Sequence, residues 1–459
     1  MTVEREESWF AFCRAISVVA ASLYCAIVGF NAVAGTDCWT YTPPSSGTKG
    51  KISWTDSSGF ENIIKGIVLD GTQIKIKANE NRSSATLKNA DFSIPVEAED
   101  GSPLSYSPEF LAGDNANAVL GYISGLTNIV VNANAISLGN YCFKGNTGLV
   151  RVRLNDGLET IRGDAFNGCS ALVTIENGLP DSVKTIGSGA FRSCTKLTGP
   201  LVFNGLETIA DRVFHSDPAL LSVDFSASSV TNFPEYVFYN CSSLESALLP
   251  ETLQTMKDGV FEGCSSLKTV APLLPPKLEQ LGTDSKPVFI NNPLEGHVVS
   301  PPTLERIGTR AFRTSKIETF TAARKGLKSI GQYAFYQNYN LTNVVLSVTM
   351  ESITGQWLEG SGRSGVPQHV WFRNLPASLP SSLWSGTTAL NITVHLPWSK
   401  QKEWREWVMS APSGHTFKFN GVSGTLPEHR NDIGTWTAGK EQYVTWWKDS
   451  DSHFTITVR

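Results

Sequence analysis

Four cysteines in the middle of the chain share one local sequence and raise the question of metal or disulfide chemistry. Cys169, Cys194, Cys241 and Cys264 each stand three residues after a phenylalanine. The gaps between them are 25, 47 and 23 residues, and none belongs to a C-x-x-C pair or has an adjacent histidine. Zinc sites usually draw their ligands from closely paired cysteines and histidines. We therefore predict no metal site and no cofactor.

The same position holds small polar residues elsewhere in the chain. Three residues after other aromatics stand Asn146, Asp217, Asn292, Ser315 and Asn338. Small side chains that can form hydrogen bonds are typical of a buried ladder that satisfies backbone groups at a bend. We predict that the cysteines of this ladder are free buried thiols. The alternative is a disulfide between adjacent turns, and Cys169–Cys194 or Cys241–Cys264 would be its first candidates.

The sequence contains no recognisable catalytic motif. Its seven histidines are scattered, and it has no H-E-x-x-H pair, G-x-S-x-G elbow or phosphate-binding glycine loop. Glu159, Glu207 and Glu305 each stand two residues before an isoleucine. Paired carboxylates for glycoside hydrolysis would need a cleft, which a regular repeat lacks. We predict that the protein is not an enzyme and has no catalytic residues.

The ladder residues belong to a repeated unit that runs along most of the chain. The segments IRGDAFNGCSAL (161–172) and IGSGAFRSCTKL (186–197) keep an aromatic residue at one position. The spacing of these aromatics lies between 22 and 28 residues. They are Phe143, Phe166, Phe191, Phe214, Phe238, Phe261, Phe289, Phe312, Phe335 and Trp357. A fixed period of this length is typical of a solenoid in which each repeat forms one turn.

Each repeat carries the signals of a short strand and a tight turn. An Ile, Leu or similar residue stands five positions before most of the aromatics, as Ile161 does before Phe166. A Leu often stands six positions after the aromatic and opens a segment such as LVRVRL (149–154). Its alternation of apolar and polar residues predicts a strand with one buried face. Small or polar residues just before the aromatic suit a 3₁₀ or helical turn.

The complete pattern, L-x-x-I-x-L-P-x-x-L-x-x-I-x-x-x-A-F-x-x-C-x-x-L, resembles the leucine-rich repeats of the BspA-type bacterial surface proteins, also called the Treponema-type class. The resemblance covers residues 126–396, about eleven repeats. It implies a right-handed, β-rich leucine-rich-repeat solenoid with a parallel sheet on its concave face and short 3₁₀ or helical turns. Members are usually secreted or surface-attached proteins that bind host matrix proteins or other cells.

Two regions depart from the repeat pattern. Leu273 to Pro302 is rich in proline, and the spacing between Phe261 and Phe289 rises there to 28 residues. Around Trp357 the usual phenylalanine is replaced, and SGRSG (361–365) follows. We predict that both regions bulge as loops from the stack, because insertions in solenoids often lie on one face.

A small β-rich region and a targeting segment precede the array. Residues 1–34 are predicted to be a signal peptide, because the uncharged segment Ala15 to Ala34 ends in Ala32-Val33-Ala34. The alternative is a retained anchor, since about 20 apolar residues can span a bilayer. Residues 35–125 contain strand signals around Asp70-Gly71, which predict a tight hairpin. We expect this region to cover the first repeat.

The C-terminal region, residues 397–459, is predicted to be a cap. Asn391 to Leu396 is expected to be the last strand of the array, and a helix is expected within Lys400 to Met409. Strands are expected near its end. The region is rich in tryptophan, with a candidate aromatic patch at Trp436, Trp446 and Trp447. These residues either seal the last repeat or stack on a glycan or partner.

The outward residues of the strands are the candidate binding surface on the concave face. They are Arg151, Arg153, Thr174, Glu176, Ser222, Asp224, Thr269, Thr319, Asn343, Thr393 and His395. We predict an exported, non-enzymatic recognition or adhesion protein at the cell surface or secreted, whose partner is a protein or cell-surface ligand. A self-associating coat component and a glycan-binding accessory protein are the alternatives. A net charge of −4 over 459 residues argues against nucleic acid, and no membrane span is predicted in the mature chain.

The proposed signal peptide has a direct test. Cleavage after Ala34 predicts a mature chain that begins at Gly35. N-terminal sequencing of the exported protein should read Gly-Thr-Asp-Cys. A membrane-bound product that still begins at residue 1 would support the retained anchor instead.

Overall fold

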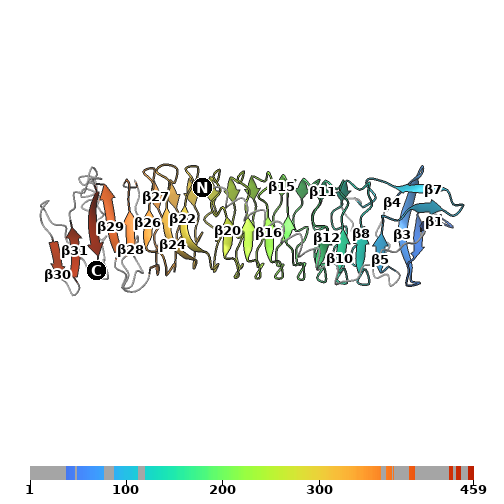
Figure 1. Cartoon of the computed structure of the whole chain (residues 1–459), viewed down its shortest axis with the longest axis horizontal. Helices are drawn as coiled ribbons and strands as arrows, with labels where there is room; N and C mark the ends of the chain where they lie inside the picture. Colours follow the sequence, from blue (N-terminus) through green and yellow to red (C-terminus); the bar gives the residue numbers. More distant parts are fainter. Residues whose placement is uncertain are drawn as a thin grey trace, which may run out of the picture.

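A computed structural model describes residues 38–46, 49–76, 87–111, 119–362, 368–374 and 376, together with strand residues 392–397, 434–437, 441–445 and 453–458. These residues form an elongated rod of stacked turns, with a small β-barrel at the N-terminal end (Figure 1). The predicted leucine-rich-repeat solenoid is confirmed. The predicted signal segment lies outside the described residues. In the view of Figure 1 the rod is nearly straight, so we call the predicted concave surface the strand face.

The first strand of each turn pairs in parallel with its counterparts in adjacent turns. Three sheets result, in the orders β5-β8-β10-β12, β14-β16-β18-β20 and β22-β24-β26-β28-β29. Their strands are β5 Asn89–Asp91, β8 Asn128–Val130, β10 Arg151–Arg153, β12 Thr174–Glu176, β14 Leu201–Val202, β16 Ser222–Asp224, β18 Ser246–Leu248, β20 Thr269–Ala271, β22 Glu295–Val299, β24 Lys316–Thr321, β26 Asn343–Val345, β28 Gln368–Trp371 and β29 Ile392–Pro397. The central residue of β10, Val152, is buried between two outward arginines, as the alternation predicts.

A second, shorter strand in each turn forms another set of parallel ladders. The orders are β9-β11-β13-β15 and β17-β19-β21-β23-β25-β27. The strands are β9 Ser137–Leu138, β11 Thr160–Ile161, β13 Thr185–Ile186, β15 Thr208–Ile209, β17 Asn232–Phe233, β19 Thr255–Met256, β21 Gln280–Leu281, β23 Arg306–Ile307, β25 Ser329–Ile330 and β27 Ser352–Ile353. Most of them end on the apolar residue that the sequence places five positions before the aromatic.

The repeat aromatics form a continuous stack through the core. Neighbouring phenylalanine rings from Phe143 to Phe335 have centroids 5.1–5.6 Å apart and lie within 26° of parallel. Trp357 continues the series, with its ring 6.1 Å from that of Phe335 and nearly perpendicular to it. All of these side chains are fully buried. Each ring therefore packs on the turn before and the turn after, which couples every repeat to its neighbours.

A closed barrel covers the N-terminal end of the stack. Its strands are β1 Trp39–Thr42, β2 Gly50–Thr55, β3 Glu61–Asp70, β4 Gln73–Ile76, β7 Pro103–Tyr106 and β6 Val96–Ala98, in that order. The predicted hairpin is present, with Asp70 paired to Gln73 and Gly71 at a φ of 61°. Strand β5 lies between β4 and β6 in the sequence but is not part of the barrel, and it pairs with β8 of the first turn. The edge of the first ladder is thereby paired rather than open.

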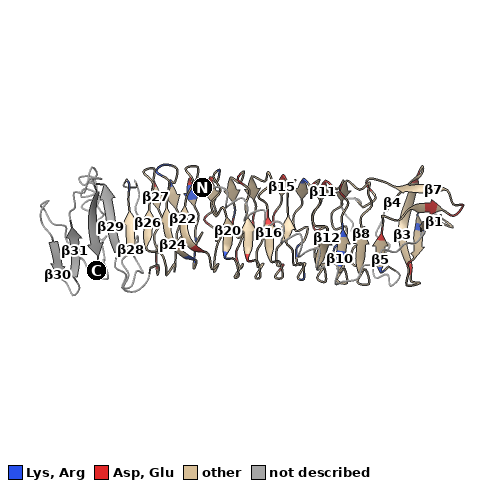
Figure 2. Ribbon diagram, viewed as in Figure 1, with Lys and Arg blue, Asp and Glu red and all other residues tan. Residues whose placement is uncertain are grey.

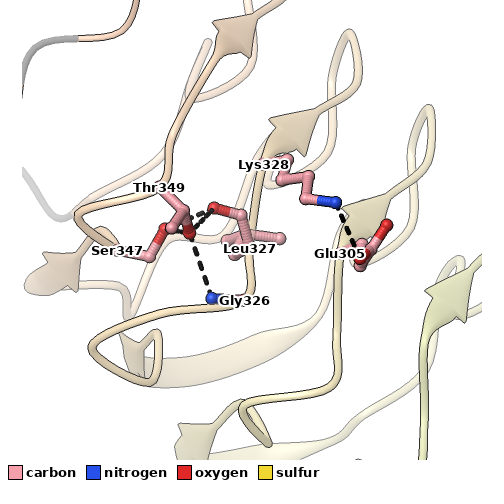
Figure 3. A network of polar contacts seen from close by, with 6 residues as sticks. All are labelled: Glu305, Gly326, Leu327, Lys328, Ser347 and Thr349. Atoms are coloured by element: carbon pink, nitrogen blue, oxygen red, sulfur yellow. Dashed lines mark hydrogen bonds and ion pairs between the residues drawn. The ribbon is translucent and has the colours of Figure 1, made fainter.

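Hydroxyl side chains tie successive turns together just before the second strands. Ser182, Thr252 and Thr303 donate to main-chain carbonyls one turn earlier, over 2.6–2.8 Å. Figure 3 shows the last example, where Ser347 and Thr349 both donate to the carbonyl oxygen of Leu327. The Gly326 amide donates to Thr349 in return, over 3.0 Å. Nearby, Lys328 pairs with Glu305 at 2.7 Å, joining two turns at the surface.

Most of the proline-rich segment is part of the stack, so the prediction of a bulging loop across Leu273 to Pro302 is wrong for most of its length and holds at residues 284–286, which form an exposed bend. Residues 273–302 contain β21 and β22, which pair with their neighbours in both ladders. The extra residues are held by Thr283, whose amide donates to the buried carboxylate of Asp258 over 2.7 Å. The repeat pattern failed here because Leu281 stands eight residues before Phe289 instead of five. Of the second irregular region, Ser361 is fully buried, and residues 363–367 lie outside the described residues.

The described C-terminal strands continue the last sheet. The predicted strand at 391–396 is β29, which pairs in parallel with β28 and antiparallel with β32 His453–Val458. Strands β31 Glu441–Thr445 and β30 Gly434–Thr437 follow. The predicted helix at 400–409 lies outside the described residues. Within the described part of the chain, no helix has the length and apolar character of a membrane span.

The aromatic stack makes a quantitative prediction about stability. Phe261→Ala should lower the free energy of unfolding by about 3–5 kcal/mol, because it opens a cavity between two stacked rings. Thr269→Ala, which changes an exposed side chain on a neighbouring strand, should change it by less than about 0.5 kcal/mol. Urea denaturation followed by circular dichroism measures both. Equal effects from the two variants would contradict this account of the core.

Candidate binding surfaces of the solenoid

The strand face begins with a charged region. Arg151 and Thr174 lie in register on adjacent strands, as do Arg153 and Glu176. All four side chains face outward, while Val152 between the two arginines is fully buried. Arg151 also lies 3.8 Å from the carboxylate of Glu176. The structure therefore brings these four predicted residues together, and Glu176 offsets one of the two arginine charges.

In the middle of the strand face, one of the two outward rows is small and polar. Ser222, Ser246 and Thr269 form one row in register across three strands. The parallel row holds Val202, Asp224, Leu248 and Ala271. The Asp224 carboxylate accepts hydrogen bonds from the amide and hydroxyl of Ser226 at 2.8 and 2.6 Å. Asp224 is thus engaged in its own turn. The predicted residues of this region are outward as expected.

The C-terminal part of the strand face has a second largely apolar row, and this one includes an aromatic residue. Val299, Thr321, Val345 and Trp371 lie in register across β22, β24, β26 and β28. The Val299 side chain is 65% exposed. We call these four residues the apolar row. The sequence analysis missed this row.

A polar row borders the apolar row. His297, Thr319, Asn343 and His369 lie in register, and His297 Nδ1 is 3.0 Å from the Thr319 hydroxyl. Burial lowers the pKa of His369, which favours its neutral form. The predicted Thr393 and His395 pair with His369 and Trp371 in the backbone register, so they extend both rows. Their side chains lie outside the described residues.

Charge does not single out one end of the rod. Figure 2 shows that basic residues and acidic residues are both scattered along the described array. Several are paired across adjacent turns, such as Lys184 with Glu207 at 3.7 Å and Lys316 with Glu295 at 3.6 Å. The apolar row, with the highly exposed Val299 and the aromatic Trp371, therefore distinguishes this part of the strand face better than charge does.

The predicted ladder is a set of buried hydrogen bonds between turns. Each ladder thiol donates to the carbonyl oxygen of the aromatic residue one turn earlier. Cys169, Cys194, Cys241 and Cys264 bond in this way to Phe143, Phe166, Phe214 and Phe238 over 3.0–3.2 Å. All six cysteines of the described residues are free, including Cys38 and Cys142, which the sequence left unassigned.

The other ladder residues make related contacts. Asn338 Nδ2 donates to the carbonyl oxygen of Phe312 over 2.6 Å, and Asn292 Nδ2 donates to that of Cys264 over 2.7 Å. Asn146 Nδ2 donates to Leu120 over 2.8 Å. Ser315 is 3% exposed, but its hydroxyl has no partner among the described residues. These positions serve the fold and are not available to a ligand.

Asp217 is the one acid among the predicted ladder residues. Its side chain is fully buried, and Oδ1 accepts the Cys194 amide over 2.7 Å. Oδ2 has no partner among the described residues. Burial raises the pKa of the Asp217 carboxyl well above its usual range, and the Cys194 amide opposes this only in part. The neutral acid is therefore the form that suits this position.

The candidate aromatic patch is only partly covered by the structure. Trp436 lies on β30, which pairs with β31 at the C-terminal end of the last sheet. Its side chain, and the whole of Trp446 and Trp447, lie outside the described residues. No described contact brings the three tryptophans together.

Comparison with known proteins identifies the repeat family. The model of the BspA type leucine rich repeat region matches residues 118–228, 177–291 and 274–364, in 6 copies. Together these ranges cover more than half of the 459 residues. The chain therefore belongs to the BspA-type leucine-rich repeat family, as the sequence pattern suggested. This repeat is generally non-catalytic. A search of curated proteins gives no match.

Solved structures with similar folds include bacterial leucine-rich repeat proteins. One from Bacteroides ovatus is 17% identical, with 78% of this chain and 94% of that chain covered and a TM-score of 0.43. The Treponema pallidum leucine rich repeat protein is 21% identical, with 52% and 85% covered and a TM-score of 0.28. A leucine rich cell surface protein from Faecalibacterium prausnitzii is 16% identical, with 79% and 96% covered and a TM-score of 0.33.

The buried acid predicts how stability depends on pH. Asp217 has a higher pKa in the folded chain than in the unfolded chain, so the folded chain keeps a proton that the unfolded chain loses above about pH 4. The free energy of unfolding therefore falls as the pH rises above about 4. Asp217→Asn removes the ionisation and should raise the free energy of unfolding by about 1–3 kcal/mol at pH 7.

Asp217→Asn should raise the free energy of unfolding much less at pH 4, where the unfolded aspartate is largely protonated. Urea denaturation at pH 4 and pH 7 measures the difference. Asn338→Asp is the matched reverse variant, and it should destabilise the protein more at pH 7 than at pH 4. If Asp217→Asn raises the free energy of unfolding equally at both pH values, the conclusion that Asp217 is neutral in the folded chain is wrong.

Proposed function

We propose that this protein is exported and binds a protein at a cell or matrix surface through the C-terminal part of its strand face. The apolar row carries the proposal. Val299, Val345 and Trp371 lie in one row of the sheet, with Thr321 between the two valines and a row of histidine, threonine and asparagine beside them. An apolar centre with a polar rim is the usual anatomy of a protein-binding site.

The alignment matters because the fold does not require it. Outward positions of the first strands vary from turn to turn, from Arg151 to Ser222 and Thr269, and they include apolar residues at Val202, Leu248 and Ala271, while the residue between them stays buried. Exposed apolar side chains scattered singly need no explanation, but several in one row form a continuous patch. The aromatic ring of Trp371 adds the residue type most often found at the energetic centre of interfaces.

Export and surface location are part of the proposal. The apolar segment before Gly35 supports export, and membership of the BspA-type repeat family supports a surface role. A recognition protein also fits the absence of a catalytic motif from the sequence. We propose no nucleic acid as a partner, because the chain has a net charge of −4.

The strand face has a direct binding test. Val299→Glu with Val345→Glu places two charges in the apolar row and should weaken binding to the partner at least tenfold, because an unpaired charge would be buried in the interface. The matched control is Ser222→Glu with Ser246→Glu, two outward residues on the same face in the middle of the array. The control should leave the affinity within about threefold.

The probes are immobilised extracellular matrix proteins and whole host cells, with binding of the mature chain measured by biolayer interferometry and flow cytometry. Sedimentation of the mature chain alone distinguishes recognition from self-assembly. Equal losses in the two double variants, or no loss in either, would count against the apolar row. Concentration-dependent assembly that Val299→Glu with Val345→Glu abolishes would favour the coat alternative.

A further inference from the structure

A second exposed surface lies on the side of each turn that follows the second strand. Its clearest feature is a cluster of Arg310 and Arg313 in one turn and Tyr333 and Tyr336 in the next, which we call the C-terminal Arg–Tyr cluster. The Arg310 guanidinium lies 5.4 Å from the centre of the Tyr333 ring, and that of Arg313 lies 4.9 Å from the Tyr336 ring. The two tyrosine rings meet edge to face, with centroids 5.3 Å apart.

The same arrangement occurs earlier in the array. Arg212 lies 5.2 Å from the ring centre of Tyr236, and His215 stacks on Tyr239 with centroids 4.7 Å apart. Tyr236 and Tyr239 also meet edge to face, at 5.5 Å. We call these four residues the N-terminal Arg–Tyr cluster. In both clusters the residues stand two before and one after the stacked phenylalanine, so the two clusters lie on the same side of the rod.

The fold does not need these side chains. At two of the four positions, those of Arg310 and Tyr333, any side chain strains the backbone. The residue two before the aromatic has a positive φ, which only glycine adopts without strain. Gly189 and Gly259 occupy this position in other turns, with φ of 61° and 67°. Arg310 and Tyr333 hold the same conformation, with φ of 57° and 58°. Tyr141, Asp164, Arg212 and Tyr236 hold it as well, so this strain recurs along the array, and glycine is a suitable replacement at each such position.

The two clusters differ in charge. Arg212 of the N-terminal cluster forms an ion pair with Asp211. His215 has a pKa lowered by burial and by the nearby Arg192 and Arg212, so it is not a further cation near neutral pH. In the C-terminal cluster, neither Arg310 nor Arg313 has an ion pair with a described carboxylate. Two guanidinium groups, each lying over a tyrosine ring, are therefore available to bind an external anion.

We propose that the C-terminal Arg–Tyr cluster binds an acidic polysaccharide. A guanidinium group donates two parallel hydrogen bonds to a carboxylate or sulfate group. Half-buried tyrosine rings offer an apolar surface and a hydroxyl for the adjacent sugar ring. Tyr339, which is 55% exposed, follows in the same turn and adds another ring to this region.

The spacing of the clusters favours a polymer over an acidic peptide. Four turns separate the two clusters, which is roughly 20 Å at the usual strand spacing of about 4.8 Å. The rod is straight in Figure 1, so an extended chain with regularly repeated rings and charges can follow this side from one cluster to the other. The N-terminal cluster would supply a weaker second contact that raises the overall affinity. The proposal is independent of binding at the strand face.

The test is titration calorimetry of the mature chain with three defined ligands. They are an oligogalacturonate of about ten residues, the same oligomer with its carboxylates methyl-esterified, and polyglutamate of equal charge. A heparin oligomer serves as a sulfated probe and distinguishes the two sources of negative charge. We expect binding of the oligogalacturonate or of heparin, with at least tenfold weaker binding of the esterified oligomer and of polyglutamate.

Substitutions to glycine separate binding from stability. Arg310→Gly and Tyr333→Gly place at each strained position the residue that other turns use. Each should weaken binding at least fivefold while leaving the thermal midpoint unchanged or higher. The charge variant Arg313→Gln should also weaken binding at least fivefold, whereas the matched Arg212→Gln, in the paired cluster, should change it by less than threefold.

Three results would overturn the proposal. The first is no binding of either acidic oligosaccharide. The second is polyglutamate binding as tight as that of the oligosaccharides, which would indicate an acidic peptide or simple charge attraction. The third is unchanged affinity in Arg310→Gly and Tyr333→Gly together with a lower thermal midpoint, which would assign the cluster a structural role.

Discussion

The solenoid depends on one recurring hydrogen bond inside a dry core. At most turns the ladder residue donates to the carbonyl oxygen of the aromatic residue one turn earlier, as Cys241 does to Phe214 at 3.0 Å and Asn338 does to Phe312 at 2.6 Å. That carbonyl lies at a bend beneath the aromatic stack, where no water can reach it. A buried carbonyl without a partner destabilises a fold by more than the bond itself contributes. The bond therefore limits which residues the ladder position accepts, and it helps to fix the register of the turns that have it.

Because the inside of each turn is fixed in this way, variation is confined to two outward surfaces. On the first strands, buried residues such as Val344 alternate with free positions such as Asn343 and Val345. On the opposite part of the turn, the aromatic stack fixes Phe335, and Tyr333 and Tyr336 around it face outward. The repeat can change either surface without changing the core. A ligand-binding surface on this scaffold consequently forms as a row across several turns, and not within one turn.

The sequence predicts the inside of the molecule far better than its surfaces. The period of the aromatics and the alternation around Val152 are strict, because both follow from close packing, and they locate the stack and both ladders. Most of the loop expected at Leu273 to Pro302 is instead part of the stack, because Leu281 serves the core from a shifted position that the template does not recognise. The apolar row was missed because it exists only across strands, in the register of Val299 with Thr321 and Val345. No spacing within a single repeat reveals such a row.

The choice of cysteine for the ladder follows from the same core. Burial raises the pKa of the Cys169 thiol to about 12, and it raises the pKa of the other ladder thiols as well. A thiol reacts with oxidants and disulfides as its thiolate, so these groups are protected by being un-ionised as well as inaccessible. Each Sγ is also engaged as a donor to a carbonyl, and it would lose that bond by pairing with another sulfur. A cysteine ladder can therefore remain reduced in oxidising surroundings, where spacing alone would suggest disulfides.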